Sequence, residues 1–572
     1  MRLICLSANR ESFKSVKFNE TGLTLIVGSK TRDGQTYNGV GKSLIVALLH
    51  FCLGSSKNGE FEAKIPQWEF TLEFELLGQH HTVSRNTSKQ NIMLLDNVEK
   101  SVSAFNAWME DRLFSIPDGV KSLTYRALLP KFMRRGQKEY VEPLETSDRS
   151  DYDMLVRNAF LLGLEVNLVA RKAELRDELV HVQQLRNNFK TDQLLRDFYS
   201  GGKDAAIHLG HLETQIKKLE QDRVKFVVAE NYFDLQKSAD ELSEQIANDT
   251  NTTFLLRSAV ENINKSLKEQ PDVPLSRLQT LYGELTQAFK PESLKRLEDL
   301  SDFHRRLLTN RVARLSREKL RLLEQLKELE VTLRAKQAAF DKYIQTLGNA
   351  KALDQYTALV NQIGELSAQA QKLRDYQNID REYSNKEAVL KGKMSDEVIA
   401  TNTYLEETRA VREVHTGVFK DYAARFYPNK VAGISVNNND GDNKTRFDLA
   451  VQIEDDSSDG INEVRIFCYD LSILSLKQGH KVGFVFHDSR LFANMDVRQR
   501  AVLFKLADEV TTRLGCQYIA TLNPDFISGM EAEFTEADFQ RIFTDNIVLT
   551  LKDDSAAGKL LGVQVNMHYD KK

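Results

Sequence analysis

The sequence is poor in cysteine and in long apolar runs, and each shortage excludes a class of protein. Its four cysteines among 572 residues are too few and too widely spread for a disulfide framework or a C-x-x-C metal pair. No apolar run reaches the ~18 residues of a membrane-spanning helix. Acidic and polar residues stand too early in MRLICLSANRESF for a signal peptide. We therefore expect a soluble cytoplasmic protein with reduced thiols and no membrane partner.

An excess of one charge is also missing. The chain carries 78 lysines and arginines against 82 aspartates and glutamates, which gives a formal net charge of −4. Any contact with nucleic acid would therefore require a local basic face. The basic candidates for DNA binding, for which a solvated helix end is the other interpretation, are Lys131, Arg134, Arg135 and Lys138. The length exceeds one ordinary core and predicts more than one structural unit.

Proline and glycine become rare between positions 161 and 415, where leucine, glutamate, lysine, arginine, glutamine and alanine dominate. Steps of three and four residues alternate along one run there: Val312, Leu315, Lys319, Leu322, Leu326, Leu329, Leu333, Lys336 and Phe340. Shorter runs with the same spacing begin at Leu168 and at Leu212. A heptad pattern of this length, with densely charged opposite faces, favours a coiled coil over a bundle of ordinary amphipathic helices.

Prolines interrupt this helical pattern at Pro271, Pro274 and Pro291. We expect the chain to turn round there, because proline breaks a helix interior. The segment has no C-x-x-C, so a zinc-clasped tip is unsupported. The pattern predicts an ascending arm, a helical apex and a descending arm over residues 161–255, 256–304 and 305–415.

The flanking ranges, 1–160 and 416–572, carry the alternating and apolar patterns of a mixed α/β fold. In the first range we predict strands at 3–6 and 23–27, a hairpin at 69–85 that turns at Gly78, and a helix that ends at Gly54. In the second we predict strands at 447–453, 482–486 and 517–521, helices at 464–476 and 498–514, and a terminal hairpin made by 546–554 and 560–569.

Residues 28–44, GSKTRDGQTYNGVGKSL, end like a phosphate-binding (Walker A) loop. The pattern G-x-x-x-x-G-K-[ST] would place its first glycine at position 36, where Thr36 stands. An apolar strand precedes the motif and a helix follows it, and this context favours a phosphate site over a chance glycine turn. Lys42 would reach the β- and γ-phosphates, and Ser43 would hold Mg²⁺. The predicted ATP contacts are Asn38, Gly39, Val40, Gly41, Lys42 and Ser43.

Two further segments could complete the nucleotide site. In FMRRGQKEYVEP, Gln137 is a candidate Mg²⁺ ligand, although most glutamines are surface residues. In VGFVFHDSRLF, an apolar strand ends in an acid, which would place Asp488 at the metal. Another register makes His487 the metal-side residue and Asp488 the base. The segment could also be an ordinary polar turn at the end of a strand, without a functional role. Ser489 stands where a glutamate would polarise the attacking water.

The stretch DDSSDGINEVRIFCYDLSIL could present a helix N-terminus to a phosphate held by another subunit. The same residues could equally form an ordinary acidic helix cap. The candidate contacts in trans are Ser458, Gly460 and Asn462.

The order of these parts resembles that of the SMC-like ABC ATPases, which include the structural-maintenance-of-chromosomes and double-strand-break-repair branches. The opening LSANRESFKSVKFNETGLTLIVG is similar to the first strands of that family, with Arg10 near a position that contacts nucleotide. FANMD resembles the loop between two ATP sites and contains Asp496. QYIATLNPD resembles the switch strand, with Asn523 where many members carry histidine.

This resemblance implies an α/β ABC-type ATPase head that is assembled from the N- and C-terminal segments, 1–160 and 416–572. A long antiparallel coiled coil would separate the two halves. The resemblance also implies that two heads form a homodimer around ATP and Mg²⁺, with Asp488 and His487 as the catalytic candidates. Hydrolysis would be slow, because Ser489 replaces the glutamate of the family.

Three phrases, YNGVGKS after a polar insertion, IFCYDL and HDS, resemble a bacterial branch more specifically. Its members are coiled-coil ATPases with a C-terminal domain of unknown function, found in three-component ABC systems such as the Lamassu-like ones. These systems are regarded as defence modules against phages or plasmids. The resemblance implies a middle subunit, an effector subunit such as a nuclease, and double-stranded DNA as partners. The alternatives are a nucleotide-binding scaffold with little turnover and a DNA-repair ATPase.

Overall fold

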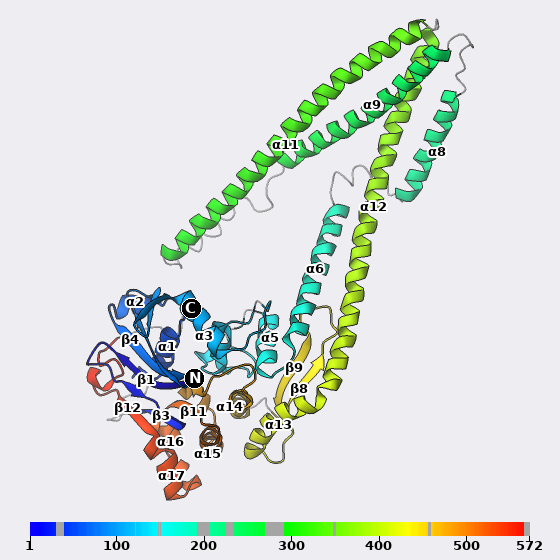
Figure 1. Ribbon diagram of the computed structural model, residues 1–572. Helices are drawn as coiled ribbons and strands as arrows, with labels where there is room; N and C mark the ends of the chain where they lie inside the picture. The colour runs from blue at the N-terminus through cyan, green and yellow to red at the C-terminus, as the bar shows by residue number, and fades with distance from the viewer. Residues whose placement is uncertain are drawn as a thin grey trace. The chain divides into compact units, whose positions relative to one another are not determined.

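The structure, a computed structural model, is shown in Figure 1. It describes residues 1–29, 39–120, 122–146, 148, 150–191, 205–224, 233–268, 291–346, 350–455 and 459–565. The chain divides into two compact units, which we call unit 1 (1–180 and 390–572) and unit 2 (181–389). Unit 1 mixes strands and helices and unit 2 is helical, which confirms the expected mixed α/β class with long helices.

A parallel sheet at the centre of unit 1 joins the two ends of the chain. Its strand order is β10 (Phe484–His487), β11 (Gln517–Leu522), β3 (Gly22–Ser29) and β12 (Ile547–Lys552). All neighbours in this sheet pair in parallel, so β3 lies between two strands that follow it by about 500 residues in the printed sequence. Figure 1 shows the blue β3 beside the red β12. β3 and β11 read as apolar runs because neighbouring strands and helices bury nearly every residue in them.

A second, antiparallel sheet packs on the same hydrophobic core. Its strand order is β2 (Val16–Lys17), β1 (Arg2–Ala8), β4 (Glu69–Leu76), β5 (Gln79–Asn86), β6 (Ile92–Leu95) and β7 (Val98–Ser101). Phe70, Leu72, Phe74 and Leu76 alternate along β4 and are fully buried. The β4–β5 hairpin turns through Gly78 at φ 76°, as predicted from the sequence.

Helices and short turns surround both sheets. The helix after the predicted phosphate loop is α1 (Lys42–Cys52). The helices α14 (Asp459–Leu476) and α15 (Val497–Leu514) precede β11 in the chain. The other elements of unit 1 are α2 (Gly59–Lys64), α3 (Val102–Leu113), α4 (Tyr125–Leu128), η1 (Leu129–Lys131), η2 (Gln137–Tyr140), α5 (Asp151–Leu161), α13 (Arg409–Phe426), β8 (Ala432–Asn438), β9 (Phe447–Ile453), η4 (Ser489–Phe492), α16 (Pro524–Ile527), η5 (Met530–Glu533), α17 (Glu536–Ile542), η6 (Thr544–Asn546) and η7 (Ala556–Gly558).

The predicted C-terminal hairpin is wrong. β12 forms its first strand, but β12 pairs with β3, and residues 553–565 contain no strand. The rest of the predicted second strand, 566–569, lies outside the described residues. Leu560 and Leu561 are buried in a loop instead. The main-chain N of Leu560 donates to the Val40 carbonyl at 3.0 Å, and the Lys14 main-chain N donates to the Leu560 carbonyl at 2.9 Å. These leucines are apolar because they are buried in a loop beside Val40, and local sequence cannot distinguish such a loop from a strand.

Unit 2 consists of long helices. α8 (Ala205–Val224), α9 (Phe233–Lys268) and α11 (Pro291–Thr346) belong to it, while α6 (Val166–Thr191) and α12 (Ala350–Glu407) extend over residues of both units. α9 packs antiparallel on α11, because Asp249 pairs with Lys336 and Arg257 pairs with Glu330. No helix among the described residues is long and apolar enough to cross a membrane.

The heptad run lies on the less exposed face of α11. Its members from Leu315 to Phe340 are buried or half-buried, and only Val312 is exposed, at 49%. Lys336, one of the two lysines in the run, ends in an ion pair of 2.7 Å with Asp249 of α9. The predicted break at Pro271 and Pro274 falls outside the described residues, as do the side chains that end the two shorter runs. Pro291 is the first residue of α11.

Candidate nucleotide-binding site

The N-terminus of α1 is open to a ligand. Gly41 precedes the helix at φ 105° and Gly39 lies at φ 79°, a region that glycine enters without strain. No side chain of the described residues caps this helix end, and N–H groups at such an end can bind an anion. Val40 is buried beneath them, and Asn38 lies outside the described residues.

Lys42 lies almost completely buried, with 6% of its surface exposed. Its Nζ donates to Asn523 Oδ1 at 2.6 Å. Burial lowers the pKa of Lys42 to about 8, although the Asp488 carboxylate favours the charged form. A Cβ at Gly28 would lie 2.7 Å from this Nζ, so a side chain there would displace the ammonium. Glycine at the end of β3 therefore makes room for the lysine.

Asp488 follows β10 and faces α1. Its Oδ2 accepts from Ser43 Oγ at 2.6 Å. Its Oδ1 accepts from Thr521 Oγ1 and from the Ser489 main-chain N, both at 2.7 Å. The main-chain N of Asp488 donates to the Tyr140 hydroxyl at 2.9 Å. These contacts fix one carboxylate beside the helix N-terminus, at the carboxyl ends of parallel strands, where α/β sheets bind ligands.

His487 lies elsewhere, because successive side chains of a strand point to opposite faces. It is fully buried, and its Nε2 lies 3.0 Å from Asp470 Oδ2 while its Nδ1 lies 3.0 Å from the Tyr518 hydroxyl. Burial lowers the pKa of His487, although the hydrogen bond with Asp470 acts in the opposite direction. Burial alone would raise the pKa of Asp470, but Arg134 and the His487 hydrogen bond hold it below its usual value. The structure thus brings Ser43 together with Asp488 and not with His487.

Gln137 is exposed at the start of η2, which lies against η4. Tyr140, at the end of η2, makes the contact with the Asp488 main chain. Arg490 of η4 places its Nε 3.9 Å from Asp488 Oδ2. The segment that contains Gln137 therefore adjoins the segment that contains Asp488, as a nucleotide site requires.

The residues predicted to act in trans are partly engaged within the chain. Asn462 Nδ2 donates to the Val141 carbonyl at 2.8 Å, and Asn462 Oδ1 accepts from Arg465 at 2.6 Å. Gly460 is buried near the Asn494 carbonyl, 3.0 Å from where its Cβ would lie. Ser458 lies outside the described residues.

Two other predicted residues have clear structural places. Asp496 caps α15 in a capping box, in which its side chain accepts from the Gln499 main-chain N at 2.6 Å. Arg10 is exposed in the turn after β1.

The predicted basic cluster for DNA is wrong for two of its four members. Lys131 and Arg134 have no exposed surface. Lys131 Nζ donates to the Leu144 carbonyl, and Arg134 forms an ion pair with Asp470 at 2.6 Å. Both side chains make internal contacts, so of the four only the half-buried Arg135 and the exposed Lys138 face solvent. Charge spacing along a sequence does not separate these two outcomes.

Sequence reasoning missed four residues that shape the site: Asn523 as the partner of Lys42, and Thr521, Tyr140 and Leu560. A signal existed for Thr521, because a parallel β10–β11 pair places it beside position 488. Nothing in the local sequence of Tyr140 or Leu560 connects either residue with a phosphate loop. Their contacts join segments that are hundreds of residues apart.

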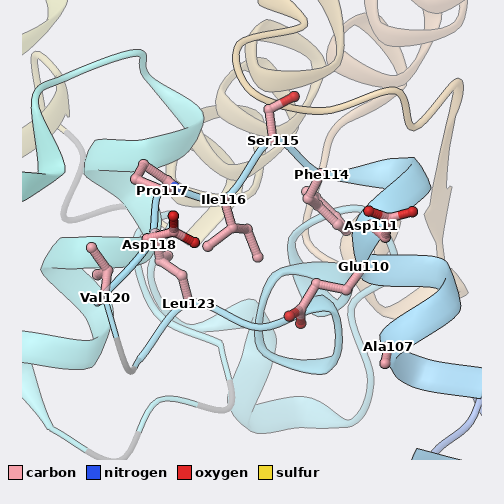
Figure 2. Close-up of a pocket in the computed structure, with 11 residues that line it drawn as sticks. Ala107, Glu110, Asp111, Phe114, Ser115, Ile116, Pro117, Asp118, Val120 and Leu123 are labelled. Atoms are coloured by element: carbon pink, nitrogen blue, oxygen red, sulfur yellow. The ribbon is translucent and has the colours of Figure 1, made fainter. Parts of the chain in front are cut away.

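A separate hollow of about 610 Å³ lies between α3 and the loop that follows it (Figure 2). Glu110, Asp111 and Asp118 contribute carboxylates to its lining. None of the predicted nucleotide-site residues lines this hollow. Among the described residues, no group of three or more histidines, cysteines, aspartates and glutamates could hold a metal ion. The hollow therefore adds no second candidate for the nucleotide.

Comparison with known proteins gives one family match. Residues 422–565 match the family described as "Uncharacterised protein conserved in bacteria (DUF2326)". The matched range contains β8, β9, α14, β10, α15, β11 and β12. No curated protein sequence matches the chain.

Similar solved structures are Smc head domains. One is the Smc head domain with a coiled coil and joint from Pyrococcus yayanosii, at 15% identity and TM-score 0.37, covering 93% of this chain and 94% of that one. Another is the Smc head domain with an extended coiled coil bound to the C-terminal domain of ScpA, from Pyrococcus furiosus, at 11% identity and TM-score 0.34, covering 93% and 91%. Because these TM-scores are below 0.5, the function proposed below depends on the geometry of this chain's own site.

Proposed function

We propose that this chain is an SMC-like ATPase that binds ATP and Mg²⁺ at the N-terminus of α1. The observation that carries the proposal is the 2.6 Å contact between Ser43 Oγ and Asp488 Oδ2 beside an uncapped helix end. A hydroxyl and a carboxylate are the hard oxygen ligands that Mg²⁺ prefers. When bound, Mg²⁺ would neutralise charge that develops on the phosphate oxygens. The residues present fit the group.

Each remaining role follows from the chain's own contacts. The main-chain N–H groups of Gly39, Val40 and Gly41 would bind phosphate oxygens, with Asn38 beside them. Lys42 Nζ donates to Asn523 Oδ1, and its ammonium, which has three N–H donors, would also donate to a phosphate oxygen. Because its pKa is about 8, this lysine is mostly charged at pH 7.

For the metal we assign Asp488 the metal-side role and remove His487 from it, since His487 faces Asp470. Gln137 would be a further Mg²⁺ ligand after a movement of η2. Ser458, Gly460 and Asn462 would contact the nucleotide of a second copy, and Arg10 would contact the nucleotide of its own copy. Asp496 would belong to the loop between the two ATP sites. These roles are expected from the resemblance to SMC-like ATPases.

Slow hydrolysis is part of the proposal. Ser489 donates its main-chain N–H to Asp488 and to Thr521 Oγ1, and its hydroxyl cannot act as the carboxylate base that polarises water. The same observation favours the second candidate function, a nucleotide-binding scaffold with little turnover. A DNA-repair ATPase is a third candidate, for which the described residues provide no specific observation.

The wider role rests on the resemblance alone. We propose a homodimer that couples ATP binding to sensing of double-stranded DNA and to control of middle and effector subunits, in defence against phages or plasmids. Since Lys131 and Arg134 are buried, the DNA contact requires basic residues other than these two. Pull-down of the chain with the products of its neighbouring genes tests this part. Recovery of a DNA-repair nuclease without any middle subunit would contradict the defence role.

Phosphate release by wild type, Lys42→Ala and Lys138→Ala tests the enzymatic proposal. Lys138 is an exposed lysine of η2, so its variant controls for loss of one positive charge near the site. We expect slow ATP-dependent release by wild type and by Lys138→Ala, and none above background by Lys42→Ala. If wild type binds ATP but releases no more phosphate than Lys42→Ala, with DNA and partners present, the scaffold function replaces the ATPase.

A further inference from the structure

Three segments meet in one buried cluster: IFCYDL and VFHDS, and FMRRGQ, which precedes them by more than 300 residues. Arg134 donates through Nε and Nη2 to the two carboxylate oxygens of Asp470, at 2.6 and 2.7 Å. Asp470 Oδ2 also lies 3.0 Å from His487 Nε2. The side chains of all three have at most 1% of their surface exposed. IFCYDL and VFHDS thus supply the two ends of one hydrogen bond.

Stability alone does not account for such a cluster. A buried ion pair costs desolvation, and well-packed apolar residues of the same volume are often as stabilising or more so. A bidentate arginine–carboxylate pair does fix orientation, because both groups are planar. We therefore look for the role of the cluster in the segments whose orientation it fixes.

The cluster contacts the three segments around Asp488. Arg134 also donates to main-chain carbonyls along the segment after Gln137, those of Glu139, Glu142, Pro143 and Glu145. Asp470 belongs to α14, the helix whose first turn contains Gly460 and Asn462. His487 shares a peptide bond with Asp488. One cluster thus connects the Gln137 segment, α14 and the end of β10.

We propose that Asp470 and His487 are positioning residues that orient the Asp488 carboxylate toward Mg²⁺, an inference that rests on the proposed function. The His487 ring has Asp470 Oδ2 3.0 Å from its Nε2 and the Tyr518 hydroxyl 3.0 Å from its Nδ1, so it is held on two sides. The peptide that follows it donates its N–H to the Tyr140 hydroxyl. Loss of the ring's contacts would remove one restraint on the end of β10 and let Asp488 move away from Ser43. Partners of this kind tune a metal site through its ligands.

Two substitutions at His487 separate this role from packing. His487→Gln retains an N–H donor that can reach Asp470, whereas His487→Leu fills much of the same volume without a donor. Binding of a fluorescent ATP analogue, measured with and without Mg²⁺, gives a readout that does not depend on turnover. We expect His487→Leu to raise the Mg²⁺ concentration for half-maximal binding about tenfold or more. Affinity without Mg²⁺ should stay at the wild-type value, and His487→Gln should restore most of the Mg²⁺ effect.

His480→Leu is the control for loss of a buried histidine, because the His480 Nε2 lies 3.1 Å from the Ile473 carbonyl and His480 is none of the predicted nucleotide-site residues. Should His487→Leu fail to fold, His487→Met takes its place as a flexible apolar substitute. An Mg²⁺ dependence of His487→Leu equal to that of wild type would overturn the inference. Equal losses with and without Mg²⁺ would overturn it too, because they would show a packing role only. Absence of Mg²⁺-dependent binding in wild type itself would overturn the proposed function as well.

Discussion

Lys131 is a lysine with no exposed surface, and its burial makes stability depend on pH. Burial lowers its pKa from 10.5 to about 7, although Asp148 and Asp470 favour the charged form. Between these two values the unfolded chain binds a proton that the folded chain does not, so the free energy of unfolding falls as pH drops. Below about pH 7 both states are protonated and this contribution is constant.

We therefore expect Lys131→Met to flatten the pH profile of stability between pH 7 and pH 10 and to raise stability at pH 7. A single group contributes a slope of up to about 1.4 kcal/mol per pH unit in that window. Urea unfolding at several pH values measures it, with Lys138→Met as the exposed control. A slope for Lys131→Met as steep as that of wild type would show that this lysine is charged in the folded protein.

Individual residues of the site could be predicted only where a motif fixes their chemistry. Lys42 and Ser43 follow from a glycine–lysine–serine at a strand–helix junction, and Asp488 follows from an acid after an apolar strand. The choice between His487 and Asp488 could not be made locally, since it depends on which face of β10 meets α1. The alternation of side chains along a strand then decides it once one contact is known, here that of Ser43 with Asp488.

Among the elements, the segment after β12 has the least expected role. Leu560 lies against the phosphate loop, where a Cβ on Gly41 would come within 2.6 Å of the Leu560 Cβ. Ser12 Oγ donates to the Leu561 carbonyl at 2.9 Å, and a Cβ on Gly562 would lie 2.2 Å from the Ser12 carbonyl oxygen. The segment is therefore packed tightly on both the phosphate loop and the turn after β1.

Leu560→Asp is expected to weaken ATP binding by about tenfold, roughly 1.4 kcal/mol, because a charged side chain cannot stay buried against Val40 and Gly41. Val563→Asp is the control, since Val563 is 38% exposed in the same segment. Isothermal titration of both variants with ATP measures the difference. Equal affinities for the two variants would show that this segment does not shape the phosphate loop.

Most strands and helices could be predicted because their patterns are local. The β4–β5 hairpin has strict alternation and a glycine turn, and α15 begins at an aspartate that caps it. The loop after β12 was predicted wrongly as a strand, because buried loop residues such as Leu560 are apolar for the same reason as strand residues. The prediction of a basic DNA-binding cluster was wrong for a similar reason, since the charge of Arg134 is paired with Asp470 inside the protein.

At the scale of the whole molecule, unit 1 is built from the two ends of the chain. β3 has β11 on one side and β12 on the other, and its residues from Gly22 to Val27 are buried. Local sequence does not specify this order, because parallel neighbours need no proximity along the chain. The N-terminal segment alone would expose both edges of a strand with an apolar surface.

We expect residues 1–180 and 390–572 to form one stable unit when they are expressed together as separate fragments. The fragment 1–180 alone should aggregate or remain unfolded, because β3 lacks both of its neighbours. Co-purification followed by thermal unfolding of the pair and of each fragment measures this. A single cooperative, stable transition for 1–180 by itself would contradict the shared sheet.

The account as a whole depends on a nucleotide site formed by Lys42, Ser43 and Asp488. Equilibrium binding of ATP to wild type, Lys42→Ala and Asp488→Asn, each with and without Mg²⁺, tests it most directly. Wild type should bind more tightly with Mg²⁺, and Lys42→Ala should lose about a hundredfold or more, roughly 2.7 kcal/mol, under both conditions. Asp488→Asn should lose only the part that Mg²⁺ adds. Equal ATP affinities for all three proteins, or no binding by wild type, would contradict the account.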